Sequence, residues 1–112
     1  MQFYAALITA AGDADAIAAV MDEHHRYMAA VDRAGKILAS GPFQDTGGGP
    51  AGMIIFATPT IAEAQKLMDG EPLTARGLRT YDLRPWRVNE GTLRTAPGLA
   101  DAGTSGAGGH EI

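Results

Sequence analysis

Two predicted strands in this sequence carry apolar side chains on both faces. In the strand predicted at residues 2–10, both alternating sets within residues 3–8 are apolar or aromatic, and residues 53–58 begin with the uninterrupted run Met-Ile-Ile-Phe. A sheet with one face in water alternates between apolar and polar residues instead. The fold must therefore bury these strands on both sides, with helices on one face and some further surface on the other.

The pattern along residues 2–88 alternates between strand and helix. Strands are predicted at residues 2–10, 36–43, 53–58 and 78–88, and helices at about 14–34 and 61–70, with a short helical turn beginning at Pro72. Asp13 and the capping box Thr60–Glu63 are typical helix starts, and Gly35 is a typical helix stop. This β-α-β-β-α-β order predicts an α+β, ferredoxin-like fold with a four-stranded antiparallel sheet.

A homodimer is the simplest way to cover the second face of that sheet. Hydrophobic residues make up 46% of the chain, but 21 of these 51 residues are alanines, so only 30 carry a large apolar side chain. Alanine adds little to the apolar area that a fold buries. A second copy that packs sheet against sheet would complete the core, and the fold would then be a dimeric α/β barrel.

The composition changes at Val88. Residues 89–112 hold six glycines and only three large apolar residues, Leu93, Leu99 and Ile112. Such a segment buries too little apolar surface to offset the entropy lost on ordering. We therefore expect one domain at residues 1–88 and a flexible, Gly/Ala-rich C-terminal tail at residues 89–112.

Composition and motifs exclude several classes of function. The chain has no cysteine, a net charge of −4, no signal-peptide pattern and no apolar run long enough to span a bilayer. We expect a cytoplasmic protein that binds neither nucleic acid nor membrane, with Arg76, Arg79, Arg84 and Arg87 on the solvated face and ends of one strand. The glycine-rich segment 47–52 matches G-x-G-x-x-G formally, but it precedes a strand and is predicted to be a hairpin loop.

His24 interrupts the apolar stripe of the first helix. That stripe consists of Ile17, Val20, Met21, His24, Met28 and Val31. A buried imidazole needs a polar partner or a wet pocket, so the pattern fits either a core histidine bonded to a carbonyl or a functional one. His25 points about 100° away, beside Asp22 and Arg26, so the two histidines are not expected to share a metal ion.

Two segments of the chain resemble the family of YCII-related proteins. The residues that carry the resemblance are His24, Tyr27, Met28, Val31 and Gly35 with the strand Lys36-Ile37-Leu38-Ala39-Ser40-Gly41-Pro42, then Ala62, Ala64, Leu67, Glu71-Pro72-Leu73-Thr74-Ala75, Gly77-Leu78 and Leu83-Arg84-Pro85-Trp86. They match a helix histidine, a glycine eleven residues on, a strand ending in Gly-Pro, a second helix, an Asp-Pro-aromatic segment and a closing strand. The resemblance covers about residues 3–87.

The resemblance implies a dimeric ferredoxin-like α/β barrel with an active centre that pairs the helix histidine with the acid of the Asp-Pro segment. In this chain those residues are His24 and Glu71. Glu71 replaces the family's aspartate, which lengthens the side chain by one methylene. Met21 stands where some members have an arginine, which leaves the recognition of an anionic substrate without its usual residue. Apart from the resemblance, Tyr4 of the first strand and the turn at Gly41 and Pro42 are candidate substrate contacts, and a purely structural role, such as ending the strand at Gly41 and Pro42, explains these residues as well.

Three functions fit these residues. The first is a cofactor-free lyase or isomerase, in which His24 and Glu71 move a proton on a small cyclic or enolisable metabolite, because an imidazole exchanges protons at neutral pH. The family's relation to muconolactone isomerase and to a dehydrochlorinase of a chlorinated hydroxyquinone supports this reading. The second is a non-catalytic module that binds a small ligand or a partner. The third is a cofactor-free monooxygenase of the same superfamily.

Overall fold

The structure is a computed structural model that describes residues 2–45 and 47–95. Within these residues the elements are β1 (Gln2–Ala10), α1 (Ala14–Arg33), β2 (Ile37–Pro42), β3 (Gly52–Phe56), α2 (Ile61–Gly70), α3 (Pro72–Ala75), β4 (Arg79–Arg87) and the 3-10 helix η1 (Thr92–Thr95). The predicted β-α-β-β-α-β order is confirmed, with α3 at the predicted helical turn. None of the described helices is long and apolar enough to cross a membrane.

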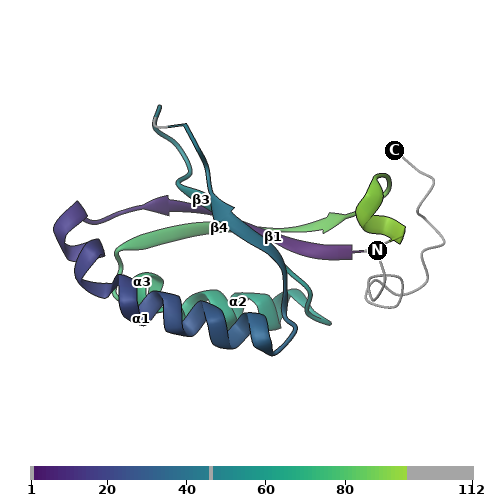
Figure 1. The fold of residues 1–112 in the computed structure, drawn as a ribbon, viewed down its shortest axis with the longest axis horizontal. Helices are drawn as coiled ribbons and strands as arrows, with labels where there is room; N and C mark the ends of the chain where they lie inside the picture. Colours follow the sequence, from purple (N-terminus) through teal and green to yellow (C-terminus); the bar gives the residue numbers. More distant parts are fainter. Residues whose placement is uncertain (1, 46, 96–112) are drawn as a thin grey trace.

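The strands form one antiparallel sheet in the order β2-β3-β1-β4. The helices lie together on one side of this sheet (Figure 1). This is the predicted α+β, ferredoxin-like arrangement, with β1 and β3 in the centre. Pro85 lies in the edge strand β4, where a residue without a backbone N–H is tolerated.

The helix ends have the expected capping residues. The Asp13 side chain accepts a hydrogen bond from the Ala16 amide at 2.9 Å, and Thr60 accepts one from the Glu63 amide at 3.2 Å. Gly35, just after α1, has a φ of +76°, a conformation that side chains other than glycine rarely adopt. These local signals fix where α1 and α2 begin and where α1 gives way to β2.

The main core lies between the helices and the sheet. Its buried members are Ala6, Ile8, Val31, Ile54, Phe56, Ala64 and Met68. One tyrosine hydroxyl connects the two long helices beside this core, and another connects the sheet to a helix. Tyr27 of α1 donates to the Leu67 carbonyl of α2 at 2.7 Å, and Tyr81 of β4 donates to Asp69 at 2.6 Å.

A register shift in β2 changes which of its side chains face the helices. Ile37 pairs with Phe56, but the next pairing joins Ala39 to Ile55, so β2 contains one extra residue, as in a β-bulge. Beyond this point Ser40 lies opposite Ile54, a residue of the helix-facing core. The bulge therefore turns Ser40, and Pro42 two residues on, toward the helix side of the sheet.

The face of the sheet opposite the helices is also apolar, as the sequence predicts. Phe3, Ile55 and Val88 form a second cluster there and are 1%, 6% and 3% exposed. None of the described α-helices covers this face (Figure 1). Trp86 pairs with Phe3 in the register and is 42% exposed. The described chain thus buries Phe3, Ile55 and Val88 on this side without an α-helix over them, and leaves Trp86 exposed.

Most of the expected flexible tail, residues 96–112, lies outside the described residues. The described part of that segment contains η1, and its Leu93 is 43% exposed. The domain boundary near Val88 stays a prediction.

Gly52 is expected to be intolerant of a side chain. A Cβ at this position would lie 2.9 Å from the Gly41 carbonyl oxygen of the paired strand, so the backbone would have to shift. Gly52→Ala should lower the free energy of unfolding by about 1–3 kcal/mol, measured by chemical denaturation. Gly41→Ala is the control, because a Cβ at Gly41 has no neighbour within 4 Å. Equal stability of the two variants would contradict this account.

Candidate active site

His24 and Glu71 meet between α1 and the start of α3. His24 Nδ1 lies 2.6 Å from Glu71 Oε1, although the two residues are 47 positions apart in the sequence. The Glu71 side chain is only 4% exposed and that of His24 is 14% exposed. A short, buried contact of this kind fixes the orientation of the imidazole ring.

Glu71 also caps the helix that follows it. Oε1 accepts a hydrogen bond from the Leu73 amide, and Oε2 accepts two from Thr74, one from its amide and one from its hydroxyl, each at 3.0 Å. Both carboxylate oxygens are therefore satisfied inside the protein. The same residue ends α2 and begins α3, so the position of the carboxylate is set by the backbone of both helices.

These hydrogen bonds keep the buried carboxyl group ionised. Burial by itself would raise the pKa of Glu71, but the bonds from His24, Leu73 and Thr74 outweigh it and lower the pKa from 4.5 to about 2. An ionised carboxylate only accepts hydrogen bonds, so the proton in the contact belongs to His24 Nδ1. The other ring nitrogen, Nε2, has no hydrogen-bond partner within the described residues.

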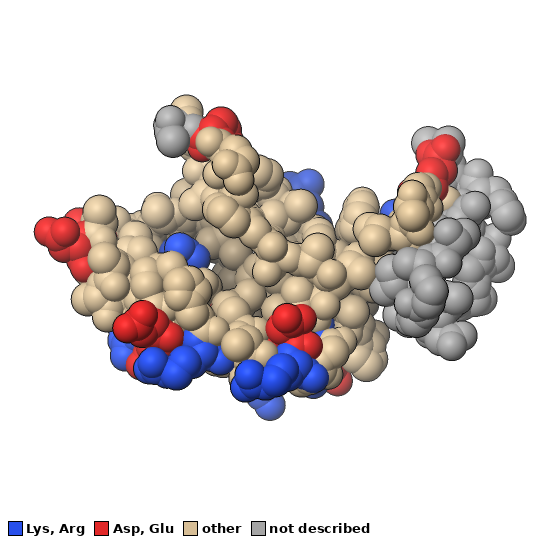
Figure 2. Space-filling view, viewed as in Figure 1, with Lys and Arg blue, Asp and Glu red and all other residues tan. Residues whose placement is uncertain are grey.

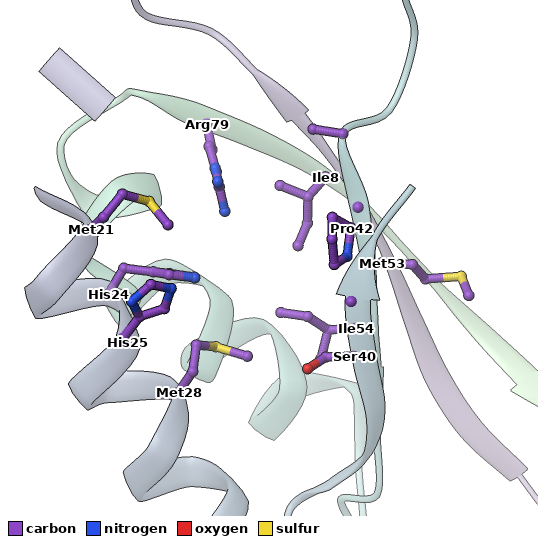
Figure 3. A pocket seen from close by; sticks show the side chains of 13 residues that line it. Ile8, Met21, His24, His25, Met28, Ser40, Pro42, Met53, Ile54 and Arg79 are labelled. Atoms are coloured by element: carbon purple, nitrogen blue, oxygen red, sulfur yellow. The ribbon is translucent and has the colours of Figure 1, made fainter. Parts of the chain in front are cut away.

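A cavity of about 300 Å³ opens beside His24, between α1 and the strands. It is lined by Ile8, Met21, His24, His25, Met28, Ser40, Gly41, Pro42, Ala51, Gly52, Met53, Ile54 and Arg79. Figure 3 shows side chains from α1 on one side of this space and from the strands on the other, with Met53 pointing away. Figure 2 shows basic atoms inside a hollow of a largely uncharged surface. The volume suits a small ring compound.

The structure places the predicted site residues differently from one another. His24 lines the cavity, and Glu71 does not line it but contacts the His24 ring. Gly41 and Pro42 contribute to the opposite wall. Tyr4 packs against the main core and does not line the cavity. The geometry joins His24 to Glu71, and their catalytic role stays a prediction.

The polar lining residues that were not predicted as site residues are His25, Ser40 and Arg79. The expectation that Arg79 is solvated is wrong, because its Nε atom is buried and the side chain reaches the cavity. The sequence pattern did contain this information. Because successive strand residues point to opposite faces, Arg79 shares a face with Tyr81 and Leu83, which pack on the helices. His25 is on the exposed flank as expected, with its ring centroid 5.4 Å from that of His24, and it also lines the cavity.

Metal-ligating side chains do not cluster here. No group of three or more His, Cys, Asp or Glu residues that could hold a metal ion occurs in the part of the chain that the structure describes.

Comparisons with known proteins agree with this architecture. The model of the YCII-related domain matches residues 1–87. Among solved structures, the chain is similar to 5-chloro-2-hydroxyhydroquinone dehydrochlorinase (TftG) from Burkholderia phenoliruptrix AC1100, in complex with 2,5-dihydroxybenzoquinone. The identity is 18% and the TM-score 0.57, over 79% of this chain and 95% of that chain, which shows a shared fold. A search of curated proteins found no match.

Glu71 should make the stability of the protein fall in acid. The pKa of Glu71 is lower in the folded protein than in the unfolded chain, so its contribution is complete above about pH 4.5 and is lost as the pH falls toward 2. Glu71→Gln should cost on the order of 2–3 kcal/mol at pH 7 and flatten the pH dependence of the unfolding free energy in this window. Denaturant titrations from pH 2 to pH 7 measure both effects.

Glu23→Gln is the matched control, because it removes the same charge from an exposed ion pair with Arg76. Exposed pairs contribute little, so this variant should stay close to the wild type. An acid transition in Glu71→Gln as steep as that of the wild type would contradict the role assigned to Glu71.

Proposed function

The chain belongs to the YCII-related family, and on that premise we propose that it is a small, cofactor-free enzyme, a lyase or isomerase that moves a proton on a small ring compound. The observation that carries the proposal is the 2.6 Å contact between Glu71 and a histidine that lines a cavity. A buried carboxylate that fixes one ring nitrogen leaves the other to exchange a proton with a bound molecule.

In the proposed mechanism, His24 Nε2 takes a proton from an activated carbon or hydroxyl of the substrate. The Glu71 carboxylate stabilises the resulting imidazolium through the hydrogen bond to Nδ1. The electron pair left behind has two outcomes. In an elimination it expels a leaving group, which departs with its own bonding pair, and in an isomerisation the imidazolium returns the proton to a different carbon.

The structural neighbour suggests which compounds to test first. That protein is named for the dehydrochlorination of 5-chloro-2-hydroxyhydroquinone and was solved with 2,5-dihydroxybenzoquinone. Both are hydroxylated six-membered rings, a size that fits a cavity of about 300 Å³. We therefore propose hydroxylated or enolisable ring compounds as the substrate class.

The second candidate is a non-catalytic module that binds such a ligand. One observation favours it: Glu71 accepts three hydrogen bonds from Leu73 and Thr74 as the cap of α3, so the carboxylate has a structural role without any catalysis. In that case the cavity binds a ligand, and His24 contributes packing and a hydrogen bond only.

His24→Ala should abolish turnover while the fold and ligand binding survive. General acid–base catalysis contributes about 10²- to 10⁴-fold, so we expect kcat to fall at least a hundredfold. Chloride release from 5-chloro-2-hydroxyhydroquinone and the ultraviolet absorbance of muconolactone report elimination and isomerisation. Calorimetry with 2,5-dihydroxybenzoquinone reports binding.

His25→Ala is the control, because His25 lines the same cavity but has no contact with Glu71. It should retain most of the turnover. Unchanged turnover in His24→Ala would remove this residue from the mechanism. Binding without turnover in the wild type would instead support the binding module.

We further propose that two copies of the chain pack sheet against sheet. The supporting observation is the apolar face opposite the helices, where Phe3 and Ile55 belong to a cluster that the described α-helices leave uncovered. Trp86, 42% exposed, extends this face at the edge strand. An apolar sheet face that no described α-helix covers and that exposes a large aromatic side chain supports association through this side.

Light scattering at micromolar concentration should give twice the chain mass of 11.6 kDa. Trp86→Glu should shift the protein toward the monomer, because it puts a charge on the apolar face. Ile61→Glu is the matched control, since Ile61 is 40% exposed but lies on α2, away from that face. A wild-type protein with the mass of one chain would contradict the proposed dimer.

A further inference from the structure

Arg79 is a partly buried cation that lines the cavity and forms no ion pair with the described residues. It is the first residue of β4, and its side chain extends from that strand into the open space between the α1 side chains and those of the other strands (Figure 3). Its Nε atom is buried and has no hydrogen-bond partner. Among the described residues its side chain forms no ion pair, in contrast to Arg76 and Arg84 of the same segment, which pair with Glu23 and Asp82.

Such an arrangement is costly unless something else supplies the missing acceptor. An arginine side chain stays charged, and removing a charged donor from water without a partner is unfavourable. Proteins that keep such an arginine generally use it to bind an anion. A planar guanidinium binds the two oxygens of a carboxylate or a similar anion in parallel hydrogen bonds.

The rest of the cavity wall strengthens the case for an anion. Among the described residues no aspartate or glutamate lines the cavity, whereas the Ser40 hydroxyl is available to donate a hydrogen bond. The nearby carboxylate of Glu71 lies behind His24 and is fully occupied by its own hydrogen bonds. The remaining side chains are apolar, chiefly Ile8, Met21, Met28 and Ile54.

We propose that Arg79 binds the anionic oxygen of the substrate and thereby restricts the cavity to small ring compounds that carry a carboxylate or an ionised enol or phenol. The ring lies against the methionine and isoleucine side chains, and the anionic group on Arg79 orients the reacting atom toward His24. This assignment rests on the proposed function, because it takes the cavity beside His24 as the substrate site. It names the substrate class for that site.

The test compares each anion with a neutral compound of similar shape. The first pair is 2,5-dihydroxybenzoquinone, whose enol hydroxyls ionise readily, and 2,5-dimethoxybenzoquinone. The second pair is benzoate and benzamide. Together the two pairs distinguish an enolate from a carboxylate. Calorimetric titration of the wild-type protein should show tighter binding of at least one anion than of its neutral partner.

Arg79→Met should abolish that preference, because methionine has similar length and no charge. Affinity for the anion should fall about ten- to a hundredfold, with little change for the neutral compound. Arg79→Lys should restore part of the affinity, since lysine keeps the charge and lacks the planar pair of donors. Arg33→Met removes the same charge from an exposed position at the end of α1 and should bind like the wild type.

Two results would overturn the proposal. One is a wild-type protein that binds neither anion more tightly than its neutral partner. The other is a folded Arg79→Met variant, verified by its circular dichroism and melting temperature, that retains the preference. Both measurements concern binding alone, so they are independent of whether His24→Ala loses turnover. A failure of the catalytic proposal is thereby distinguished from a failure of this one.

Discussion

The buried carboxylate of Glu71 is the group on which the rest of the site depends. It lies where α2 ends and α3 begins, and it connects that junction to α1 through His24. An aspartate at this position would reach the first amides of α3, as N-cap residues commonly do. The longer glutamate caps the helix and contacts the imidazole with the same side chain. The exchange for the family's aspartate is therefore compatible with both contacts in this fold.

The opposite wall of the cavity is built by the backbone more than by side chains. Gly52 allows the β2 backbone to approach closely, since a Cβ there would lie 2.9 Å from the Gly41 carbonyl. The register shift between Ile37 and Ala39 then turns Ser40 toward the helices. Two irregularities in one strand pair thus open a space beside His24, where a regular pair would present a flat sheet. Irregular strands beside functional sites commonly have this effect.

Local rules predicted the fold of this chain because the signals are contiguous in the sequence. Each of three signals, the N-caps Asp13 and Thr60 and the helix stop at Gly35, depends only on residues within four positions. The structure has all three where they were predicted. The site is different, because His24 and Glu71 meet across 47 positions, and only the resemblance to a family paired them. The bulge in β2 could not be predicted from the sequence, because its residues fit a regular strand as well.

Arg79 shows that residue type alone can give the wrong exposure for a side chain. Charged residues in an edge strand are normally solvated, and Arg84 is an example, with its side chain 72% exposed. Position along the strand carries the contrary information, because alternation puts Arg79 on the face of Tyr81 and Leu83. Residue type gives only the average exposure of an arginine over many proteins. The position in the strand, by contrast, is set by the packing of this sheet, so it decides which face Arg79 lies on. A buried charge in phase with the core is therefore a reason to look for a ligand.

The alternation of β3 separates the cavity from the second apolar face. Ile54 lines the cavity and Ile55 packs on the other side of the sheet, although they are neighbours in the chain. Residues that share no contacts usually contribute independently to stability and binding. The wall of the cavity and the second apolar face are thus free to change separately, so one scaffold can keep that face while the lining of its cavity changes. In this chain the ligand-facing side is the one that holds the unpaired arginine.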